Sequence, residues 1–292
     1  MRVACVQIAP VEWDPAATVA KAEEWLDRAA AAGVELAVFP EGYLPGYSAI
    51  QRAKQGGSPA EVAAVLASLE QIPGPATGRI GAKAREHGLH VVFGMLGWAG
   101  GGDRPCNASV LFGPDGSILN IHKKAHLTPV YEAPDFEAGS EFAVTGTALG
   151  PIGNMVCADF TLPETTRLLA VKGARLVCGS LAAWSEPGVV NIYLRSHTSP
   201  SKALDNDLFL VMCNFVGRNA GMEFIGRSRI IDRSGELVAE GGEGPDAEEL
   251  VIADLDLEQA GGAPFRLMDR RRPELYAGLL APNDVTEVVW RG

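Results

Sequence analysis

Glu41, Lys124 and Cys157 lie far apart in the chain and have the side chains that acyl transfer to a thiol requires. A thiolate attacks a carbonyl carbon. A carboxylate can take the thiol proton and later activate a water molecule. A fixed ammonium group can stabilise the oxyanion of the tetrahedral intermediate, together with the backbone N–H of Ala158. These residue types predict an enzyme that works through a thioester on Cys157.

Cys157 stands at the end of a short apolar run that begins with Gly153, and Pro163-Glu164 lead into a helix. A cysteine between a strand and a helix lies at the carboxyl edge of a sheet, where open α/β sheets bind their ligands. The free N–H groups and the positive dipole end of the helix favour a thiolate. The alternative is a buried cysteine that acts as a small apolar side chain, as most free cysteines do.

Glu41 and Lys124 also follow expected strands. Glu41 comes after the buried strand at residues 36–39, and carboxylates are rarely buried without partners. Its alternative role is to cap the next turn. The ammonium of Lys124 can point into a cleft, whereas the alternative for Lys123-Lys124 is a solvated pair. A papain-like site would instead pair the cysteine with a histidine, and His126 is the histidine nearest to a motif.

The composition is that of an ordinary globular protein, with 292 residues and a net charge of -11. This acidic charge argues against nucleic acid or an anionic membrane as a partner. No apolar run approaches the roughly 18 residues that span a membrane. The five cysteines form no C-x-x-C pair, so neither a disulfide framework nor a zinc ribbon is expected. We expect a cytoplasmic protein without a metal or another cofactor.

Apolar periodicity and turn residues predict an alternation of helices and strands. Helices are expected at residues 17–32, 59–71, 77–87, 165–172 and 189–204. Strands are expected at residues 2–8, 36–39, 90–96, 142–147, 153–157, 175–179, 208–214 and 251–255. Hairpins are expected at residues 108–123 and 228–240, about Pro114-Asp115-Gly116 and Ser234-Gly235. The long loop at residues 125–141 has no clear period, which is typical of functional or disordered segments.

Residues 110–116 resemble residues 229–235, and the strands before them, at residues 90–96 and 209–215, lie at the same offset along the chain. Two similar halves of helix, strand and hairpin favour two sheets packed face to face, with helices outside. The alternative is a pair of unrelated hairpins.

The chain resembles the nitrilase superfamily of carbon–nitrogen hydrolases in three blocks whose order and spacing also fit. The blocks are Phe39-Pro40-Glu41, Lys123-Lys124-Ala125-His126-Leu127 and Cys157-Ala158-Asp159-Phe160-Thr161-Leu162-Pro163-Glu164. Asn107 before the first hairpin is a lesser match. The resemblance implies a four-layer αββα sandwich with pseudo-two-fold halves. It places a hydrolase domain at residues 1–260 and a C-terminal arm at residues 261–292.

The same resemblance implies roles for individual residues and for a partner subunit. Glu41, Lys124 and Cys157 are the implied catalytic residues. Many members have a second glutamate after the lysine, for which Glu132 is the best match and Glu137 and Glu141 are weaker candidates. The family commonly dimerises through helices beside the active site, with help from the arm, so we expect a homodimer or a higher homo-oligomer.

Departures from the family pattern bear on the substrate. Nitrilases proper usually have Cys-Trp-Glu, whereas Cys157-Ala158-Asp159 resembles the amidase branches and argues against nitriles. Carbamoylases often carry an arginine where this chain has Phe160 and Thr161. An N-carbamoyl amino acid is therefore disfavoured, unless Arg195 or Arg218 reaches the site from elsewhere.

Four aromatic residues are candidates for an apolar pocket wall: Tyr43, Tyr47, Phe160 and Trp184. Core packing is the alternative for each of them. The function expected from the sequence is hydrolysis of a small linear carboxamide, with release of ammonia or an amine. Alternatives are an N-carbamoyl amide hydrolase, an acyltransferase, or a catalytically silent binding protein on the same fold.

Overall fold

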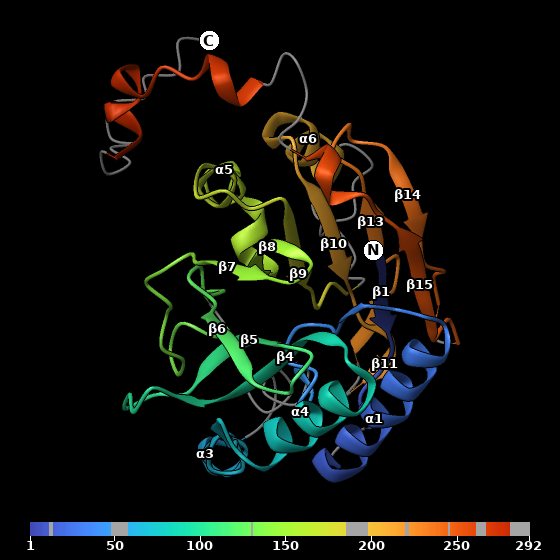
Figure 1. Ribbon diagram of the computed structural model, residues 1–292. Coiled ribbons are helices and arrows are strands. Elements are labelled where there is room, and N and C mark those ends of the chain that lie inside the picture. The colour runs from blue at the N-terminus through green and yellow to red at the C-terminus, as the bar shows by residue number, and fades with distance from the viewer. Residues whose placement is uncertain are drawn as a thin grey trace.

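The structure is a computed structural model that describes residues 1–11, 14–47, 58–129, 131–184, 198–219, 222–244, 246–260 and 267–280. In these residues the chain forms two main β-sheets that pack face to face, with helices on the two outer faces (Figure 1). A short hairpin of β11 (Val216–Asn219) and β12 (Met222–Ile225) forms a separate small sheet.

The first half of the chain builds one main sheet. Its elements are β1 (Arg2–Gln7), α1 (Pro15–Ala31), β2 (Leu36–Val38), α3 (Pro59–Ala67), β3 (Gln71–Ile72), α4 (Pro75–His87), β4 (His90–Ala99), β5 (Cys106–Phe112) and β6 (Ile118–Lys123). One further strand, β15 (Glu249–Asp254), joins this sheet from late in the chain, so the strand order is β15-β1-β2-β4-β5-β6, and β3 pairs with β4. Neighbouring strands among β1, β2 and β4 are parallel, whereas β5, β6 and β15 (Glu249–Asp254) add antiparallel pairs.

The second half builds the other main sheet in the same way. Its elements are β7 (Val144–Thr147), β8 (Gly150–Val156), η1 (Cys157–Thr161), α5 (Pro163–Val171), β9 (Leu176–Ser180), α6 (Thr198–Asn206), β10 (Phe209–Cys213), β11 (Val216–Asn219), β12 (Met222–Ile225), β13 (Arg229–Ile231) and β14 (Leu237–Glu240). The strand order is β14-β13-β10-β9-β8-β7, with a parallel centre and antiparallel edges. The predicted sandwich of two similar halves is confirmed.

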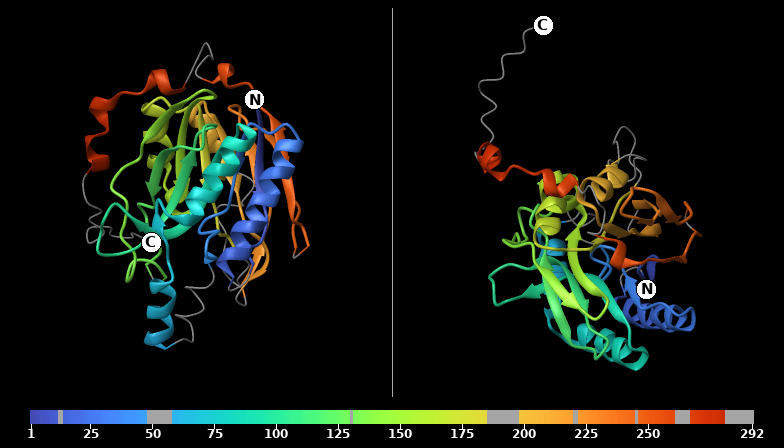
Figure 2. Two further views of the ribbon diagram at one scale, coloured as in Figure 1. Left: turned by 60° about the horizontal axis from the view of Figure 1, so that its bottom comes forward. Right: turned by 45° about the horizontal axis from the view of Figure 1, so that its top comes forward.

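Three buried apolar layers hold the four layers of the sandwich together. Leu26 of α1 and Ile80 of α4 belong to the layer that covers the outer face of the first sheet. Leu36 and Leu176 belong to the layer between the sheets. Leu169 of α5 belongs to the layer that covers the second sheet. Figures 1 and 2 show α1 and α4 on one side of the molecule, with α5 and α6 on the other. Strands buried on both faces are expected to be almost continuously apolar.

The local sequence explains where α1 starts and which of its faces packs on the sheet. Asp14 caps the helix, because its side chain accepts a hydrogen bond from Ala17 N at 2.9 Å. Pro15 occupies the first turn, where no N–H is needed. Val19, Ala22 and other buried residues recur at helical spacing, so one stripe of the helix packs on the sheet.

The structure differs from several of the predicted boundaries and adds elements that were not predicted. The helix expected at residues 59–71 ends at Ala67, and Gln71–Ile72 instead pair as β3 with Trp98 and Ala99. This pairing, with that of Gly97 and Cys106, extends β4 to Ala99, beyond the predicted strand end at residue 96. The hairpin of β11 and β12 was not predicted. The helix expected at residues 189–204 lies partly outside the described residues. Its described part belongs to α6, which ends at Asn206.

The described part of the arm consists of three short 3-10 helices, η4 (Leu267–Arg270), η5 (Pro273–Leu275) and η6 (Ala277–Leu280). Met268 of η4 packs on the layer beneath α5 and α6, whereas η5 and η6 stand off the body (Figures 1 and 2). Leu279 and Leu280 are largely exposed. Among the described helices, none combines the length and apolar character needed to cross a membrane.

Candidate active site

The site lies where the carboxyl ends of parallel strands from the two sheets meet. After β2, Glu41 N donates to Leu181 O at 3.1 Å. At the end of β9, Ser180 Oγ donates to Phe39 O at 2.9 Å. These bonds join the two sheets directly at the edge where α/β sheets bind their ligands.

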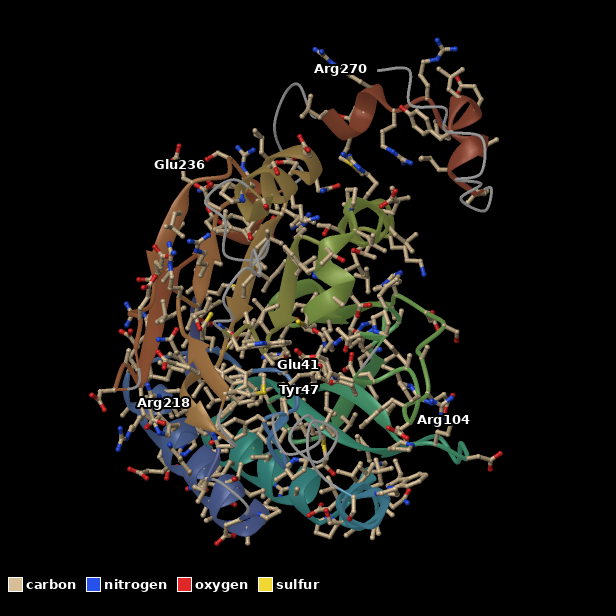
Figure 3. The ribbon with its side chains drawn as sticks, turned by 180° about the vertical axis from the view of Figure 1, so that it is seen from behind. Glu41, Tyr47, Arg104, Arg218, Glu236 and Arg270 are labelled. Carbon is tan, nitrogen blue, oxygen red and sulfur yellow. The ribbon has the colours of Figure 1, made fainter. Side chains whose placement is uncertain are left out.

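Lys124 is the centre of a buried polar cluster. Its Nζ donates to Glu41 Oε1 and to Glu132 Oε2, both at 2.7 Å. Asn107 Nδ2 bridges the same two carboxylates at 2.7 Å and 2.6 Å. The Lys124 and Glu41 side chains are fully buried, and Figure 3 shows Glu41 beside Tyr47 in the interior of the molecule. The predicted Glu41, Lys124 and Glu132 are therefore in direct contact.

The loop after Lys124 is folded so that Glu132 alone of its three candidate glutamates reaches the lysine. Thr128 donates from its backbone N to Glu132 Oε2 at 2.8 Å and also from its hydroxyl. Glu137 instead pairs with Lys123 at 3.2 Å, and Glu141 is exposed.

Cys157 follows β8 directly and starts the 3-10 turn η1. Its φ of 40° lies in the left-handed region that residues other than glycine rarely adopt. Such strain is typical of functional positions. The thiol, which is 8% exposed, interacts with the Glu41 carboxylate and with the backbone N–H of Ala182.

Burial raises the pKa of the Cys157 thiol well above its ordinary value, and the negative charge of Glu41 adds to this shift. The Lys124 ammonium opposes the shift without cancelling it. The resting sulfur is therefore a thiol. This direction opposes the thiolate that the following helix was expected to favour, because burial disfavours the charged form of the sulfur.

The buried cluster shifts the pKa values of Glu41, Glu132 and Lys124 in ways that separate their roles. Burial raises the pKa of Glu41, and Glu132 adds to the shift while Lys124 opposes it. Burial alone would raise the pKa of Glu132, but Lys124 and the Thr128 hydrogen bonds outweigh it and lower that pKa. Burial would lower the pKa of Lys124, yet the carboxylates raise it well above its ordinary value. Glu41 is thus the better proton acceptor, and Lys124 stays charged.

The arrangement can transfer the proton of Cys157 to Glu41 and place a cation near the reacting sulfur. Glu41 Oε2 is buried without a hydrogen-bond partner among the described residues, so it retains a free lone pair. Ala158 lies in the first turn of η1, where backbone N–H groups lack helical partners. The position of Ala158 is therefore consistent with the predicted oxyanion role of its N–H.

Two of the predicted pocket residues flank the cluster. The Tyr47 ring centroid lies 5.7 Å from Lys124 Nζ, and the Tyr47 hydroxyl lies 3.4 Å from Thr128 Oγ1. Trp184 meets the ring of Tyr131, next to Glu132, edge to face at 6.1 Å. These contacts place both rings close to the cluster, and their role as pocket walls stays a prediction.

Two other predicted aromatics lie in the core. Phe160 belongs to the buried layer beneath α5 and α6, and its ring faces Lys202 Nζ at 5.5 Å. Tyr43 is fully buried against Phe39 and Phe93. Both rings are buried in apolar layers, so the alternative of core packing applies to them and the prediction of a pocket wall is corrected.

Arg218 does not approach the cluster. It lies exposed on the hairpin of β11 and β12, at the edge of the molecule in Figure 3, and pairs with Glu223 at 2.9 Å. Arg195 lies outside the described residues.

Sequence reasoning missed what Asp159 and Asn107 do. Asn107 was quoted only as a lesser match, yet it bridges both glutamates. Asp159 was quoted only within the third block, yet its carboxylate is fully buried and hydrogen-bonded to His122 and His126. A carboxylate set between apolar residues was the available signal, because such a group needs buried partners.

Within the described residues, the one cluster of three side chains that could hold a metal ion is Asp27, Glu86 and His87. It lies on the outer helices α1 and α4, and Lys83 Nζ already contacts Asp27 at 2.7 Å. This cluster has no part in the site around Lys124.

Comparison with known proteins agrees with this geometry. The model of the carbon–nitrogen hydrolase family matches residues 2–265. A nitrilase from Pyrococcus abyssi is 30% identical over 259 residues, or 88% of this chain and 90% of that protein. An (R)-stereoselective amidase from a Pseudomonas species is 30% identical over 273 residues, or 93% of this chain and 92% of that protein.

A solved amidase from a Nesterenkonia species has a TM-score of 0.76 and 26% identity, over 96% of each chain. A mutant of that amidase, at 25% identity and a TM-score of 0.76, shows acrylamide added at its active-site cysteine; the match covers 96% of this chain and 100% of the mutant. The chain belongs to the carbon–nitrogen hydrolase family and is a hydrolase that acts on non-peptide carbon–nitrogen bonds.

Proposed function

We propose that this hydrolase cleaves small linear carboxamides through a thioester on Cys157, with Glu41 as base and Lys124 as oxyanion partner. The observation that carries the proposal is the Lys124 ammonium, held at 2.7 Å from both Glu41 and Glu132, beside a thiol that interacts with Glu41. A binding role on the same fold does not need all of these groups.

In the first half-reaction, Glu41 takes the proton of Cys157 as the sulfur attacks the amide carbon. The Lys124 ammonium and the Ala158 N–H stabilise the negative charge that forms on the carbonyl oxygen. The tetrahedral intermediate then collapses, the C–N bond breaks, and the nitrogen leaves with the proton held by Glu41. The acyl group stays on sulfur as a thioester.

In the second half-reaction, Glu41 takes a proton from a water molecule that attacks the thioester carbon. The same donors stabilise the second oxyanion. Collapse of this intermediate breaks the C–S bond, and the proton on Glu41 returns to the sulfur. The products are the carboxylic acid and ammonia or an amine, and the enzyme regains its thiol.

Glu132 supports both steps without touching the reacting atoms. Its pKa is lowered by Lys124 and Thr128, so it remains a carboxylate when Glu41 is protonated. It therefore keeps the Lys124 ammonium charged and in place throughout the cycle.

Relatives favour an amide as the substrate. One of them is an (R)-stereoselective amidase, and the solved Nesterenkonia protein is an amidase. Ala158 leaves room beside the nucleophile, where nitrilases proper usually carry a tryptophan. N-carbamoyl amides and acyl transfer to an acceptor other than water are the alternatives.

A panel of linear amides and N-carbamoyl compounds, assayed for ammonia, tests the proposal. We expect turnover of short carboxamides by the wild-type enzyme and none by Cys157→Ala with unchanged circular dichroism. Turnover of N-carbamoyl compounds alone would replace the proposed substrate class. Absence of any ammonia release by a folded wild-type enzyme would reject the hydrolytic function.

We also propose a homodimer or a larger homo-oligomer in the cytoplasm. The apolar side chains of Leu275, Leu279 and Leu280 in the described arm support self-association, because they are largely exposed in the single chain. The five free cysteines and the required thiol support a reducing compartment.

A further inference from the structure

Asp159 lies two residues after the nucleophile, in the turn η1, and its side chain is fully buried. Its Oδ2 accepts a hydrogen bond from His122 Nε2 at 2.8 Å and from Val156 N at 3.2 Å. Its Oδ1 accepts from Ala125 N at 3.1 Å. It also accepts from His126, from the backbone N and from ring Nδ1, both at 2.9 Å. One carboxylate therefore accepts hydrogen bonds from several segments of the chain.

These segments are the ones that carry the reacting groups. Val156 directly precedes Cys157, whereas Ala125 and His126 directly follow Lys124. His122 comes from β6, two residues before Lys124. The nucleophile and the oxyanion partner come from different sheets, so a fixed distance between them requires a link across the sandwich.

Charge-assisted hydrogen bonds and ring packing hold this link through Asp159 in place. Burial alone would raise the pKa of Asp159, but hydrogen bonds from His122 and His126 outweigh it, and the pKa lies below its ordinary value. The group is thus an anion, and charge-assisted bonds to it are the stronger kind. Phe142 also packs on both imidazole rings, with centroids at 5.2 Å from His122 and 6.0 Å from His126.

We infer that Asp159, held by His122 and His126, is a positioning residue that fixes the turn of Cys157 against the loop of Lys124. It touches neither substrate nor reacting atoms. It acts by setting the distance between the attacking sulfur and the oxyanion partner. The kinetic part of this inference rests on the proposed amide hydrolysis, while the hydrogen-bonded link itself does not.

The test compares two reactions of Cys157. Amide hydrolysis needs sulfur, Glu41 and Lys124, whereas alkylation by iodoacetamide needs the sulfur and its base but forms no oxyanion. Replacing His122 by Leu removes a donor to Asp159, and His122→Gln restores an N–H. We expect kcat of His122→Leu to fall by roughly 10²-fold, as for a small misplacement of reacting groups, with KM and the alkylation rate little changed. His122→Gln should recover most of kcat.

His90→Leu is the matched control. His90 is also a buried histidine of the first sheet, but it opens β4 at the end of the sheet remote from the site. It should leave kcat unchanged. Equal losses of hydrolysis and alkylation in His122→Leu, or an equal loss of kcat in His90→Leu, would show a general structural role and overturn the inference.

A second measurement does not depend on activity or on a folded His122→Leu protein. In wild-type protein with ¹⁵N-labelled histidine, the ring N–H of His122 should give a downfield resonance that exchanges slowly with solvent and is absent from His122→Gln. Fast exchange of that proton would overturn the link. If the wild-type enzyme released no ammonia but showed the resonance, the proposed function would fail and the link would stand.

Discussion

Lys124 binds two carboxylates at the same distance, yet their surroundings give the two different tasks. Glu132 receives further hydrogen bonds from Thr128, which lower its pKa. Glu41 keeps one carboxylate oxygen without a partner among the described residues, and burial raises its pKa. Pairs of acids whose environments separate their pKa values are typical of divided acid–base roles. Glu41 therefore moves protons while Glu132 holds the cation.

Glu132→Gln should lower kcat/KM by roughly 10²-fold, because Lys124 loses one of the charges that place it. The change should also lower the stability of the protein, because the Glu132 side chain is buried and hydrogen-bonded. We expect a loss of about 1–3 kcal/mol, as for a buried polar group left partly unsatisfied. Steady-state kinetics and thermal unfolding measure the two effects.

Glu137→Gln is the control for this change. It removes a carboxylate from the same loop that contacts only Lys123 among the described ion pairs. Kinetics and unfolding should stay those of the wild type. Unchanged kinetics in Glu132→Gln, or an equal loss in Glu137→Gln, would refute the role of Glu132.

The pH dependence of kcat/KM should report Glu41 on its acid limb. Glu41 must be a carboxylate to take the thiol proton, and its pKa is raised by burial. Activity should therefore fall, as pH decreases, at an apparent pKa above the ordinary value of about 4.3. Lys124 must stay protonated, and its pKa is raised, so it should impose no basic limb below about pH 10. An acid limb at or below the ordinary glutamate value would contradict the assignment of the base.

At the scale of elements, each reacting residue follows a strand closely, and the strands bring them together. Glu41 comes three residues after β2, Lys124 directly after β6 and Cys157 directly after β8. The apolar runs made these strands predictable, and the residues at their ends were predictable with them. Tertiary contacts decided the rest: β3 formed because Gln71–Ile72 could pair with the end of β4, and no local pattern encodes that partner.

Gly94→Ala should displace the turn that carries Glu41. A Cβ at Gly94 of β4 would lie 1.9 Å from Pro40 O, so the Pro40-Glu41 segment must move. We expect destabilisation of about 1–3 kcal/mol, as for an overpacked core, and a fall in kcat/KM. Chemical denaturation and kinetics provide the measurements.

Gly78→Ala is the matched glycine replacement. Gly78 is exposed in α4, and a Cβ there would meet nothing within 4 Å among the described residues. It should stabilise the protein by up to about 1 kcal/mol, because alanine favours the helix, and leave activity unchanged. A Gly94→Ala protein with wild-type stability and activity would show that the turn does not depend on this contact.

At the scale of the whole molecule, the sequence predicted more of the architecture than of the site. The echo between residues 90–116 and 209–235 corresponds to β4 with β5 and to β10 with β13, which hold equivalent places in the two sheets. By contrast, the burial of Tyr43 and Phe160 was not predictable, because an aromatic near a strand end fits a pocket or a core equally well. Asp159 was missed for a similar reason, since its partners come from another sheet.

Removal of the arm should change the oligomeric state. Leu275, Leu279 and Leu280 are 62%, 68% and 89% exposed in the single chain, which is typical of an interaction surface when such side chains cluster. We expect light scattering to show that the intact protein is at least a dimer. A chain ending at Ala260 should form an assembly of fewer subunits. A full-length variant with serine in place of Leu275, Leu279 and Leu280 is the control, because it removes the apolar side chains and keeps the chain length. A monomeric intact protein would contradict the proposal.

The central claim is that the acyl group of an amide substrate passes through a thioester on Cys157. Acid quenching of the wild-type enzyme during turnover, followed by mass spectrometry of intact protein and peptides, tests it directly. We expect an added acyl group on the peptide that contains Cys157, removable by hydroxylamine and absent from Cys157→Ala. Amide turnover by Cys157→Ala, or an acyl group carried on another residue, would contradict it.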